Sequence, residues 1–221
     1  MTRRLELPDT PGTAALGAAR MSAPSALRNR DLIAAELRRV APAWGRALEI
    51  ASGTGEHVIR FAEVMPGLTW QPTDPDPLRR ASIAAWTMQS GLDNIRPPLD
   101  LDAARVGWAE EEPLTADLVV VVNLLHLISG AEAETALTET AAVLSPGGVV
   151  ALYGPFLRDG EATSEGDAVF HASLRAQDPA IGYKDVIDTC ACLVEAGLAH
   201  VETVAMPANN LLLVFERSDV A

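Results

Sequence analysis

A glycine-rich turn that follows a short apolar strand constrains this chain of 221 residues more than any other feature. Residues 47–51 form the predicted strand, and residues 52–55 form the turn. Gly53 and Gly55 let the backbone approach a ligand closely, because a glycine has no Cβ atom in the way. In an open α/β sheet, ligands bind beyond the carboxyl ends of the strands, where this turn lies. Two glycines alone do not establish such a site, since a tight strand-to-helix turn without a ligand has the same pattern.

Strand-like apolar runs and helical patterns alternate along the rest of the chain. The further predicted strands lie at 68–72, 95–101, 117–122 and 149–153, and two prolines weaken the run at 95–101. This alternation indicates a parallel sheet with right-handed crossovers. The end of the chain differs, because the runs at 200–206 and 211–216 are joined by only four residues, which predicts an antiparallel hairpin. We therefore predict an α/β fold with a mostly parallel seven-stranded sheet, an antiparallel C-terminal hairpin and helices on both faces.

Local signals mark where two of the predicted helices begin and end. Asp76 can cap free N–H groups and Pro77 fits the first helical position, so a helix is expected to begin there and to end at Gly91. A second helix is expected over about 131–144, where a Ser-Pro-Gly-Gly run stops it. The polar segment 154–166 that follows the fifth strand is interpreted as a long loop.

A single folded domain is expected over residues 25–217. Residues 1–24 carry Pro, Gly, Thr and Ala with little periodicity, and we interpret them as a flexible tail, with a lid that orders on ligand binding as the alternative. Residues 218–221 are interpreted as a short C-terminal tail. The N-terminal stretch has no long apolar run, so neither a signal peptide nor a membrane span is predicted. Two cysteines cannot form a disulfide framework, which favours a cytoplasmic location.

The chain is acidic, with 17 Lys and Arg against 30 Asp and Glu and a formal charge of −13. Acidic groups repel phosphates, so neither a nucleic acid nor an anionic membrane is expected as a partner. The expected partner is a small-molecule substrate, and the chain is expected to be a monomer or a homodimer. No metal is predicted, because the four histidines have no metal-ligand spacing and Cys190 and Cys192 point to different sides of a helix.

Acidic residues accompany the first three predicted strands, at the same edge of the sheet as the glycine turn. Asp74 lies 74 − 55 = 19 residues after the second glycine, a spacing at which an acid accepts hydrogen bonds from ribose hydroxyls. Asp102 could receive an adenine amino group, although a solvated loop acid explains it equally well. Glu49 could face an ammonium group, and an ion pair with Arg46 or Arg28 is the alternative.

The ligand that these residues fit best is S-adenosylmethionine (SAM). A dinucleotide-binding turn would carry a third glycine where this chain has Val58, and no Gly-Lys-Ser/Thr run for a nucleoside triphosphate is present. Glycines and acids without a cation near the turn suit a ligand that lacks phosphate. SAM has a ribose, an adenine, a sulfonium cation and an amino-acid head group, and its demethylated product is S-adenosylhomocysteine (SAH). The predicted cofactor-binding residues are Glu49, Ala51, Gly53, Gly55, Asp74, Asp102 and Asn123.

Four ordered strings resemble the methyltransferase-like protein 26 family, a domain-of-unknown-function family of class I SAM-dependent methyltransferase-like proteins. They are Ala47-Leu-Glu-Ile-Ala-Ser-Gly-Thr-Gly55, Trp70-Gln-Pro-Thr-Asp-Pro-Asp76, Leu152-Tyr-Gly-Pro-Phe156 and Met206-Pro-Ala-Asn-Asn-Leu211, and the likeness runs from about Ala26 to Arg217. The resemblance implies the Rossmann-like class I methyltransferase fold, and it implies no particular acceptor. Ala51 departs from the general class I pattern, which often has glycine there, yet alanine is small enough for cofactor binding to be expected.

Polar residues after the fourth and fifth predicted strands are the candidates for the catalytic side. Asn123 could orient an acceptor, His126 could act as a general base, and Tyr153 ends the fifth strand. Each has a structural alternative: a satisfied turn amide, a structural histidine and a solvated loop. Further candidates for the acceptor pocket are Arg158, Asp159, Glu161, His171, Tyr183, Asn209 and Asn210.

The leading prediction is an enzyme, a SAM-dependent methyltransferase that methylates a small molecule by in-line displacement. Holding the acceptor in line with the S–CH₃ bond can supply on the order of 7–11 kcal/mol, so the reaction does not require a catalytic dyad. One alternative is a SAM-using enzyme of another reaction type, such as aminocarboxypropyl transfer or cyclisation. The other alternative is a non-catalytic SAM-binding subunit.

Overall fold

The computed structural model describes Leu5, residues 20–111 and residues 114–218. Most of the predicted terminal tails, namely 1–4, 6–19 and 219–221, lies outside these described residues. The described chain forms two compact units. The first contains the residues up to Asp102 together with Ala116–Val119, and the second contains Ala103–Thr115 and the residues from Val120 onward.

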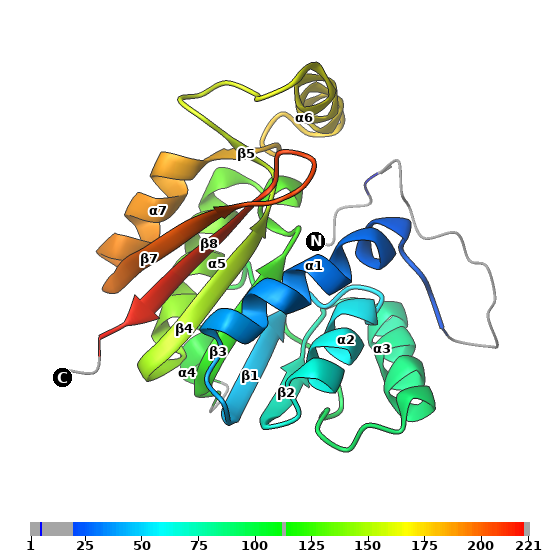
Figure 1. Ribbon diagram of the computed structural model, residues 1–221. Helices are drawn as coiled ribbons and strands as arrows, with labels where there is room; N and C mark the ends of the chain where they lie inside the picture. The colour runs from blue at the N-terminus through cyan, green and yellow to red at the C-terminus, as the bar shows by residue number, and fades with distance from the viewer. Residues whose placement is uncertain (1–4, 6–19, 112–113, 219–221) are drawn as a thin grey trace. The chain divides into compact units, whose positions relative to one another are not determined.

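The first unit is built from three helices, two parallel strands and the strand segment Ala116–Val119. Its elements are α1 (Pro24–Val40), β1 (Gly45–Ile50), α2 (Glu56–Val64), β2 (Leu68–Pro72) and α3 (Pro77–Ser90). Figure 1 shows α1 running beside α2. The helices bury one side: Leu37 of α1 and Phe61 of α2 are fully buried, and the Phe61 ring lies 5.5 Å from the ring of Trp70 on β2. Burying each such side chain contributes about 1.5–3 kcal/mol.

The predicted limits of α3 are confirmed. The Asp76 side chain accepts a hydrogen bond from the backbone N–H of Leu78 at 2.8 Å, Pro77 occupies the first turn, and Gly91 ends the helix with a φ of 69°. Each signal acts on residues only a few positions away from it, so the sequence alone was enough to locate both ends of the helix.

The predicted strand at 95–101 is wrong. This segment makes only isolated parallel bridges to β2, at Trp70 with Ile95 and at Thr73 with Leu99. Pro97 and Pro98 lie between the two bridges and have no N–H to donate, so a continuous ladder cannot form there. The main sheet therefore has six strands instead of the predicted seven.

The second unit carries the remaining helices and the antiparallel strands. Its elements are α4 (Trp108–Glu111), the end of β3 (Ala116–Val122), a short 3₁₀ helix at Leu125–Leu127, α5 (Gly130–Ala142), β4 (Leu144–Gly154), β5 (Phe156–Leu157), α6 (Glu165–Gln177), β6 (Lys184–Asp185), α7 (Val186–Glu195), β7 (Leu198–Ala205) and β8 (Leu211–Arg217). A capping box formed by Ser129 and Glu132 begins α5. The predicted helix at 131–144 is confirmed with slightly different ends.

The strand order of the six-stranded sheet is β2-β1-β3-β4-β8-β7. β1 and β2 are parallel, whereas β8 pairs antiparallel with β4 on one side and with β7 on the other. The predicted C-terminal hairpin is thus confirmed, and the turn at Ala208 and Asn209 has positive φ angles of 55° and 58°. The predicted α/β fold with a mostly parallel sheet is confirmed as well.

The segment 154–166 contains more regular structure than a long loop. β5 pairs in parallel with β6, and Figure 1 shows this pair and α6 beyond the end of β4. Arg158 and Glu161 close a tight turn in which Asp159 and Gly160 have φ angles of 55° and 78°. The partner strand β6 lies more than twenty residues later, so no local signal could have revealed this pairing.

A bilayer crossing needs about 20 consecutive apolar residues in a helix. Within the described ranges, none of the helices has that length and apolar character.

Candidate functional site

The loop between β1 and α2 has an unusual backbone conformation. Ala51, Gly53 and Gly55 have φ angles of 54°, 61° and 103°. A Cβ atom on Gly55 would lie 3.0 Å from Ile83 Cα, so this glycine is needed for packing against α3. At Gly53, the nearest atom to such a Cβ would be the Ala51 carbonyl oxygen at 4.0 Å, so the loop borders open space there. Ala51 adopts the left-handed region in spite of its side chain, at a modest cost in strain.

Asp74 lies beside this loop. Gly53 N–H donates to Asp74 Oδ2 at 3.0 Å, and Asp76 N–H donates to Asp74 Oδ1 at 2.9 Å. The Asp74 side chain is fully buried, and this burial raises its pKa, while the two backbone hydrogen bonds and the charge of Arg79 act in the opposite direction. Asp74 thus lies close to the glycine turn, as the spacing in the sequence predicted.

Cations lie closer to Asp74 than the sequence suggested. Arg79 Nη1 is 3.7 Å from Asp74 Oδ2, and its side chain is 43% exposed. Arg80 donates to the backbone oxygen of Asp74 at 2.8 Å and forms an ion pair with Asp100 at 3.0 Å. Both arginines occupy the first turn of α3, which brings them back to the end of β2, so the expectation of a site without a nearby cation is wrong.

Glu49 is a buried carboxyl group with a free oxygen. The residue is 1% exposed, and its Oε2 atom has no hydrogen-bond partner among the described residues. The pKa of Glu49 is raised to about 8: burial is the main cause, the neighbouring carboxylates of Asp74 and Glu56 act in the same direction, and a hydrogen bond with Ser52 opposes them. The strongest charges acting on Glu49 are therefore carboxylates, and the guanidinium groups of Arg46 and Arg28 are not among them.

Asp102 differs from the other predicted cofactor residues. It is exposed, and it follows an irregular segment because the expected third strand does not form.

On the second unit, Asn123 and Tyr153 meet at the ends of β3 and β4. Asn123 N–H donates to the Tyr153 carbonyl oxygen at 2.8 Å, and Asn123 has a positive φ of 55°. Its Oδ1 atom lies 3.8 Å from the point where a Cβ on Gly154 would stand. Tyr153 is 5% exposed, so it is not the solvated loop residue of the alternative interpretation.

His126 is buried in an aromatic cluster. Its ring centre lies 5.8 Å from that of Phe170 and 6.0 Å from that of Tyr183, both edge to face. Burial, together with a smaller effect of the Lys184 charge, lowers the pKa of His126 to about 3. The imidazole is therefore neutral near pH 7, and it is a weak base.

Asp167, at the start of α6, gathers hydrogen bonds from three segments. Its Oδ2 accepts from Ser164 Oγ at 2.7 Å, from Thr163 Oγ1 at 3.0 Å and from Asn209 Nδ2 at 2.9 Å. Its Oδ1 accepts from the Tyr183 hydroxyl at 3.2 Å. Four side-chain hydrogen bonds lower the pKa of Asp167 in spite of partial burial. Asp167 thus joins α6, the β7–β8 turn and the aromatic cluster around His126.

The other acceptor-side candidates have varied roles. Arg158 donates to the Asn209 carbonyl oxygen at 3.0 Å, and Asn210 donates to carbonyls of its own turn. Asp159 and Glu161 are exposed in the tight turn, and His171 Nδ1 accepts from Tyr183 N–H at 3.0 Å.

Three polar residues around the glycine loop escaped the sequence analysis. Thr54, Glu56 and Ser82 are 6%, 1% and 0% exposed. Glu56 directly follows Gly55 at the first position of α2, which is the one signal that could have singled it out. Ser82 and Asp167 come from distant parts of the chain, and nothing local marks their partners.

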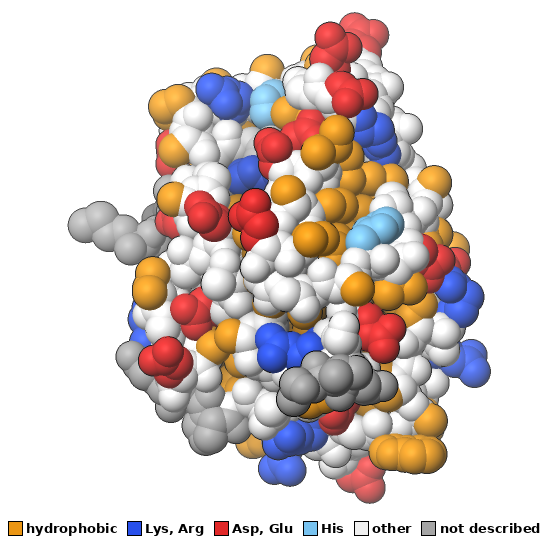
Figure 2. Space-filling model, turned by 90° about the vertical axis from the view of Figure 1, so that its left-hand side faces the viewer, with side chains coloured by type: hydrophobic (Ala, Val, Ile, Leu, Met, Phe, Trp, Pro, Cys, Tyr) orange, Lys and Arg blue, Asp and Glu red, His pale blue; other side chains and the backbone are white. Residues whose placement is uncertain are grey.

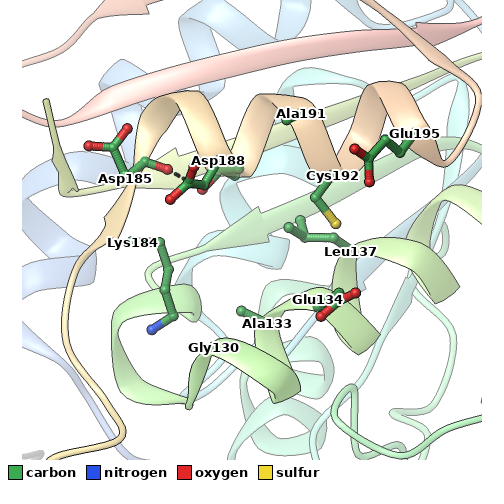
Figure 3. A pocket seen from close by; sticks show the side chains of 11 residues that line it. Gly130, Ala133, Glu134, Leu137, Lys184, Asp185, Asp188, Ala191, Cys192 and Glu195 are labelled. Atoms are coloured by element: carbon green, nitrogen blue, oxygen red, sulfur yellow. Dashed lines mark hydrogen bonds between the residues drawn. The ribbon is translucent and has the colours of Figure 1, made fainter. Parts of the chain in front are cut away.

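A hollow of about 370 Å³ lies between α5 and α7 in the second unit (Figure 3). Its lining includes Ala133 and Leu137 of α5, Cys192 of α7 and the acids Glu134 and Asp188. None of the predicted site residues lines it. Within the described part of the chain, no group of three or more His, Cys, Asp or Glu side chains could hold a metal ion.

Comparison with known proteins identifies one family and many related structures. The profile of the family described as "Protein of unknown function (DUF938)" matches residues 20–217. An O-methyltransferase family protein from Burkholderia thailandensis is similar in structure with a TM-score of 0.76 and 19% identity, over 89% of this chain and 57% of that chain.

Two further similar structures were solved with a ligand bound. Human N-acetylserotonin methyltransferase, in complex with SAM, has a TM-score of 0.68 and 16% identity, over 88% of this chain and 53% of its own. CalO1, a methyltransferase in calicheamicin biosynthesis in its SAH-bound form, has a TM-score of 0.64 and 18% identity, over 85% and 54%. The chain spans just over half the length of these three proteins. At such identities the likeness establishes the fold, which is that of the SAM-dependent methyltransferases.

Proposed function

The chain belongs to the DUF938 family, and we propose that it is a SAM-dependent methyltransferase that transfers a methyl group to a small-molecule acceptor. The observation that carries the proposal is the glycine loop, which borders open space at Gly53 and lies beside two buried carboxyl groups, Glu49 and Asp74. The similar structures with bound SAM or SAH support it. The resemblance to the methyltransferase-like protein 26 family, a cytoplasmic location and a monomeric or dimeric state belong to the same proposal.

Glu49 is suited to an ammonium group. Its Oε2 atom is buried and has no partner within the described ranges, which is costly unless a ligand supplies a donor. The amino-acid head group of SAM would supply that donor and a positive charge. A Cβ atom on Gly53 would have no neighbour nearer than 4.0 Å, which is consistent with room for this head group on the loop.

Asp74 is suited to ribose hydroxyls. A carboxylate can accept about four hydrogen bonds, and the backbone N–H groups of Gly53 and Asp76 occupy one site on each oxygen. Because the side chain is fully buried, a ribose reaches it only after a rearrangement, and the Arg79 side chain, which is 43% exposed, is a neighbour that could move aside. Asp102 and Asn123 are proposed at the adenine and methyl ends of the ligand.

Asn123, His126 and Tyr153 are proposed on the acceptor side. SAM, when bound, supplies an electrophilic methyl group on its sulfonium. A histidine with a pKa of about 3 does not take a proton efficiently at neutral pH. We therefore assign His126 the role of orienting an acceptor through a neutral ring nitrogen, with Asn123 as a second polar contact.

Calorimetric titration with SAH tests the cofactor site. The wild-type chain should bind SAH, and Asp74→Ala should weaken binding by about 1.5–3 kcal/mol, the range for hydrogen bonds to a charged group. Asp93→Ala is the matched control, since Asp93 is exposed and should leave the affinity unchanged. Unchanged affinity in a folded Asp74→Ala variant would mean that another acid holds the ribose, with Asp76 as the next candidate. No binding at millimolar SAH would overturn the proposal.

The product separates this proposal from other SAM chemistry. Methyl transfer breaks the S–CH₃ bond, forms a bond between the methyl group and the acceptor, and leaves SAH. Transfer of the aminocarboxypropyl group leaves methylthioadenosine instead. Detection of methylthioadenosine after incubation with SAM and candidate small molecules would favour the alternative reaction type.

A further inference from the structure

The four residues Arg20–Ala23 precede α1 and are called the strap below. The strap hydrogen-bonds with Glu56 and Ser82, two side chains that also hold the glycine loop and are called the supports. Ala23 N–H donates to Glu56 Oε1 at 2.7 Å, and Met21 N–H donates to Ser82 Oγ at 2.8 Å. On α3, Trp86 Nε1 donates to the Met21 carbonyl oxygen at 2.9 Å. The guanidinium carbon of Arg20 lies 4.3 Å from the centre of the Trp86 ring. The strap is thus held by four separate contacts within the first unit.

The side chains that hold the strap also hold the glycine loop. Thr54 Oγ1 donates to the second carboxylate oxygen of Glu56, and Ser82 Oγ donates to the Thr54 carbonyl oxygen at 2.8 Å. Each support therefore uses one hydrogen-bonding site for the strap and another for Thr54, which lies between Gly53 and Gly55. Both supports are buried, with exposed fractions of 1% for Glu56 and 0% for Ser82.

Two separate hydrogen-bonded paths connect the glycine loop to the strap. One runs from Thr54 through Glu56 to Ala23, and the other runs from Thr54 through Ser82 to Met21. A displacement of the loop at Thr54 must strain or break bonds to groups that fix the strap. A buried donor or acceptor that loses its partner costs more than the bond itself contributes, so the two segments favour moving together.

We propose that Glu56 and Ser82 are positioning residues that couple the strap to the glycine loop, so that a nucleoside ligand on the loop and the docked strap stabilise each other. The coupling is reciprocal, because two events that share one set of contacts change each other's free energy equally. This inference rests on the proposed function, since it takes SAH as the ligand of the loop.

Hydrogen exchange on the wild-type chain tests the coupling without a variant. The amides of Met21 and Ala23 donate to the two supports, and saturating SAH should slow their exchange about tenfold, a typical coupling between two sites. The amide of Arg46, which donates to Asp117 Oδ2 at 2.8 Å in the same unit, is the internal reference and should change much less.

Three substitutions identify the supports. Glu56→Ala and Ser82→Ala should each raise the Kd for SAH about fivefold or more and should abolish the ligand-dependent protection of the strap. Glu56→Gln should stay within about twofold of the wild-type Kd, because its carbonyl can accept from Ala23 and its amide can donate to Thr54. Glu63→Ala, which removes an exposed carboxylate paired with Arg60 on the same helix, is the matched control and should behave like the wild type.

The outcomes separate this inference from the proposed function. If the wild-type chain binds SAH and the Met21 and Ala23 amides exchange equally fast with and without it, the coupling is refuted and the proposed function stands. If Glu56→Gln fails as badly as Glu56→Ala, the hydrogen-bond relay through Glu56 is refuted. If the wild-type chain binds no SAH, the proposed function itself fails and this inference falls with it.

Discussion

The buried carboxyl group of Glu49 links ligand binding to a proton. Its pKa is raised to about 8, chiefly by burial, so the group is mostly protonated at pH 7. An ammonium group beside it would favour the charged form and lower this pKa. We expect SAH binding at pH 7 to release close to one proton, which calorimetry in buffers of different ionisation enthalpy measures.

Glu49→Gln is the control for this proton release. The amide keeps the shape of the side chain and has no proton to lose in this range, so binding should become independent of the buffer. Wild-type binding without proton exchange would show that no cation approaches Glu49.

Substitutions on the acceptor side should act on turnover and leave the cofactor in place. His126→Ala and Tyr153→Phe are expected to keep the Kd for SAH within a few-fold and to lower turnover or acceptor binding in a methylation assay with candidate small molecules. Because burial holds the pKa of His126 near 3, we expect no histidine-dependent step in the rate between pH 6 and 8. His200→Ala on exposed β7 is the control.

Two results would contradict this assignment. Loss of SAH binding in both variants would place these residues at the cofactor. Full turnover in both would make them structural, with the acceptor held by the backbone and the loop instead.

At the scale of elements, Asp167 determines how firmly α6 is attached. Asp167→Ala removes the acceptor of four side-chain hydrogen bonds and should lower the free energy of unfolding of the second unit by about 1–2 kcal/mol, since the group is only partly buried. Urea denaturation measures this loss, and limited proteolysis should find faster cleavage around α6. Glu161→Ala in the exposed tight turn is the control. Equal proteolysis of the two variants would mean that packing of Phe170 and Tyr183 alone holds the helix.

The elements that the sequence predicted well are those with local signals. Asp76, Pro77 and Gly91 bound α3. The four consecutive valines at 119–122 are buried in β3, as expected for β-branched residues in a strand covered on both faces. The start of β4 at Leu144 was missed, because Ser145-Pro-Gly-Gly148 has the composition of a turn. Pairing with distant strands overrides such local preferences.

The same distinction applies to the candidate site. Gly53, Gly55 and Asp74 follow a known spacing, so the sequence placed them together. The contacts of Ser82 with Thr54 and of Asp167 with Asn209 join residues 28 and 42 positions apart. Such pairs depend on the whole fold, and neither composition nor periodicity contains them.

For the whole molecule, the pH dependence of stability near neutral pH is dominated by His57, His126 and Glu49, the buried groups with the largest pKa shifts in that range. Burial lowers the pKa of His57 to about 4 and that of His126 to about 3. Below pH 6.5 the unfolded chain therefore binds more protons at these histidines than the folded chain does, and the free energy of unfolding falls as the pH drops. Glu49 acts oppositely: the folded chain keeps its proton up to about pH 8, so stability falls as the pH rises from 4.5 to 8. The two trends together predict a maximum near pH 6.5.

Chemical denaturation between pH 5 and 8 measures this maximum. Glu49→Gln should remove the decline above pH 6.5, and His57→Gln should weaken the decline below it. If the decline above pH 6.5 persists unchanged in Glu49→Gln, another group causes that decline.

The face in Figure 2 carries acidic, basic and apolar side chains interspersed. The −13 charge of the chain adds a broad electrostatic repulsion to the effects of the individual buried groups.

The place of β8 between β4 and β7 has a consequence for biosynthesis. β4 is complete at Gly154, yet the residue that pairs with its end, Leu211, follows 211 − 154 = 57 residues later. Until β8 has left the ribosome, β4 and β7 each lack their shared neighbour, and their open backbone edges are available to other chains. Such distant pairing also slows folding. A nascent chain of this protein is therefore most prone to aggregation in the interval before β8 emerges, when chaperones that cover exposed strand edges would benefit it most.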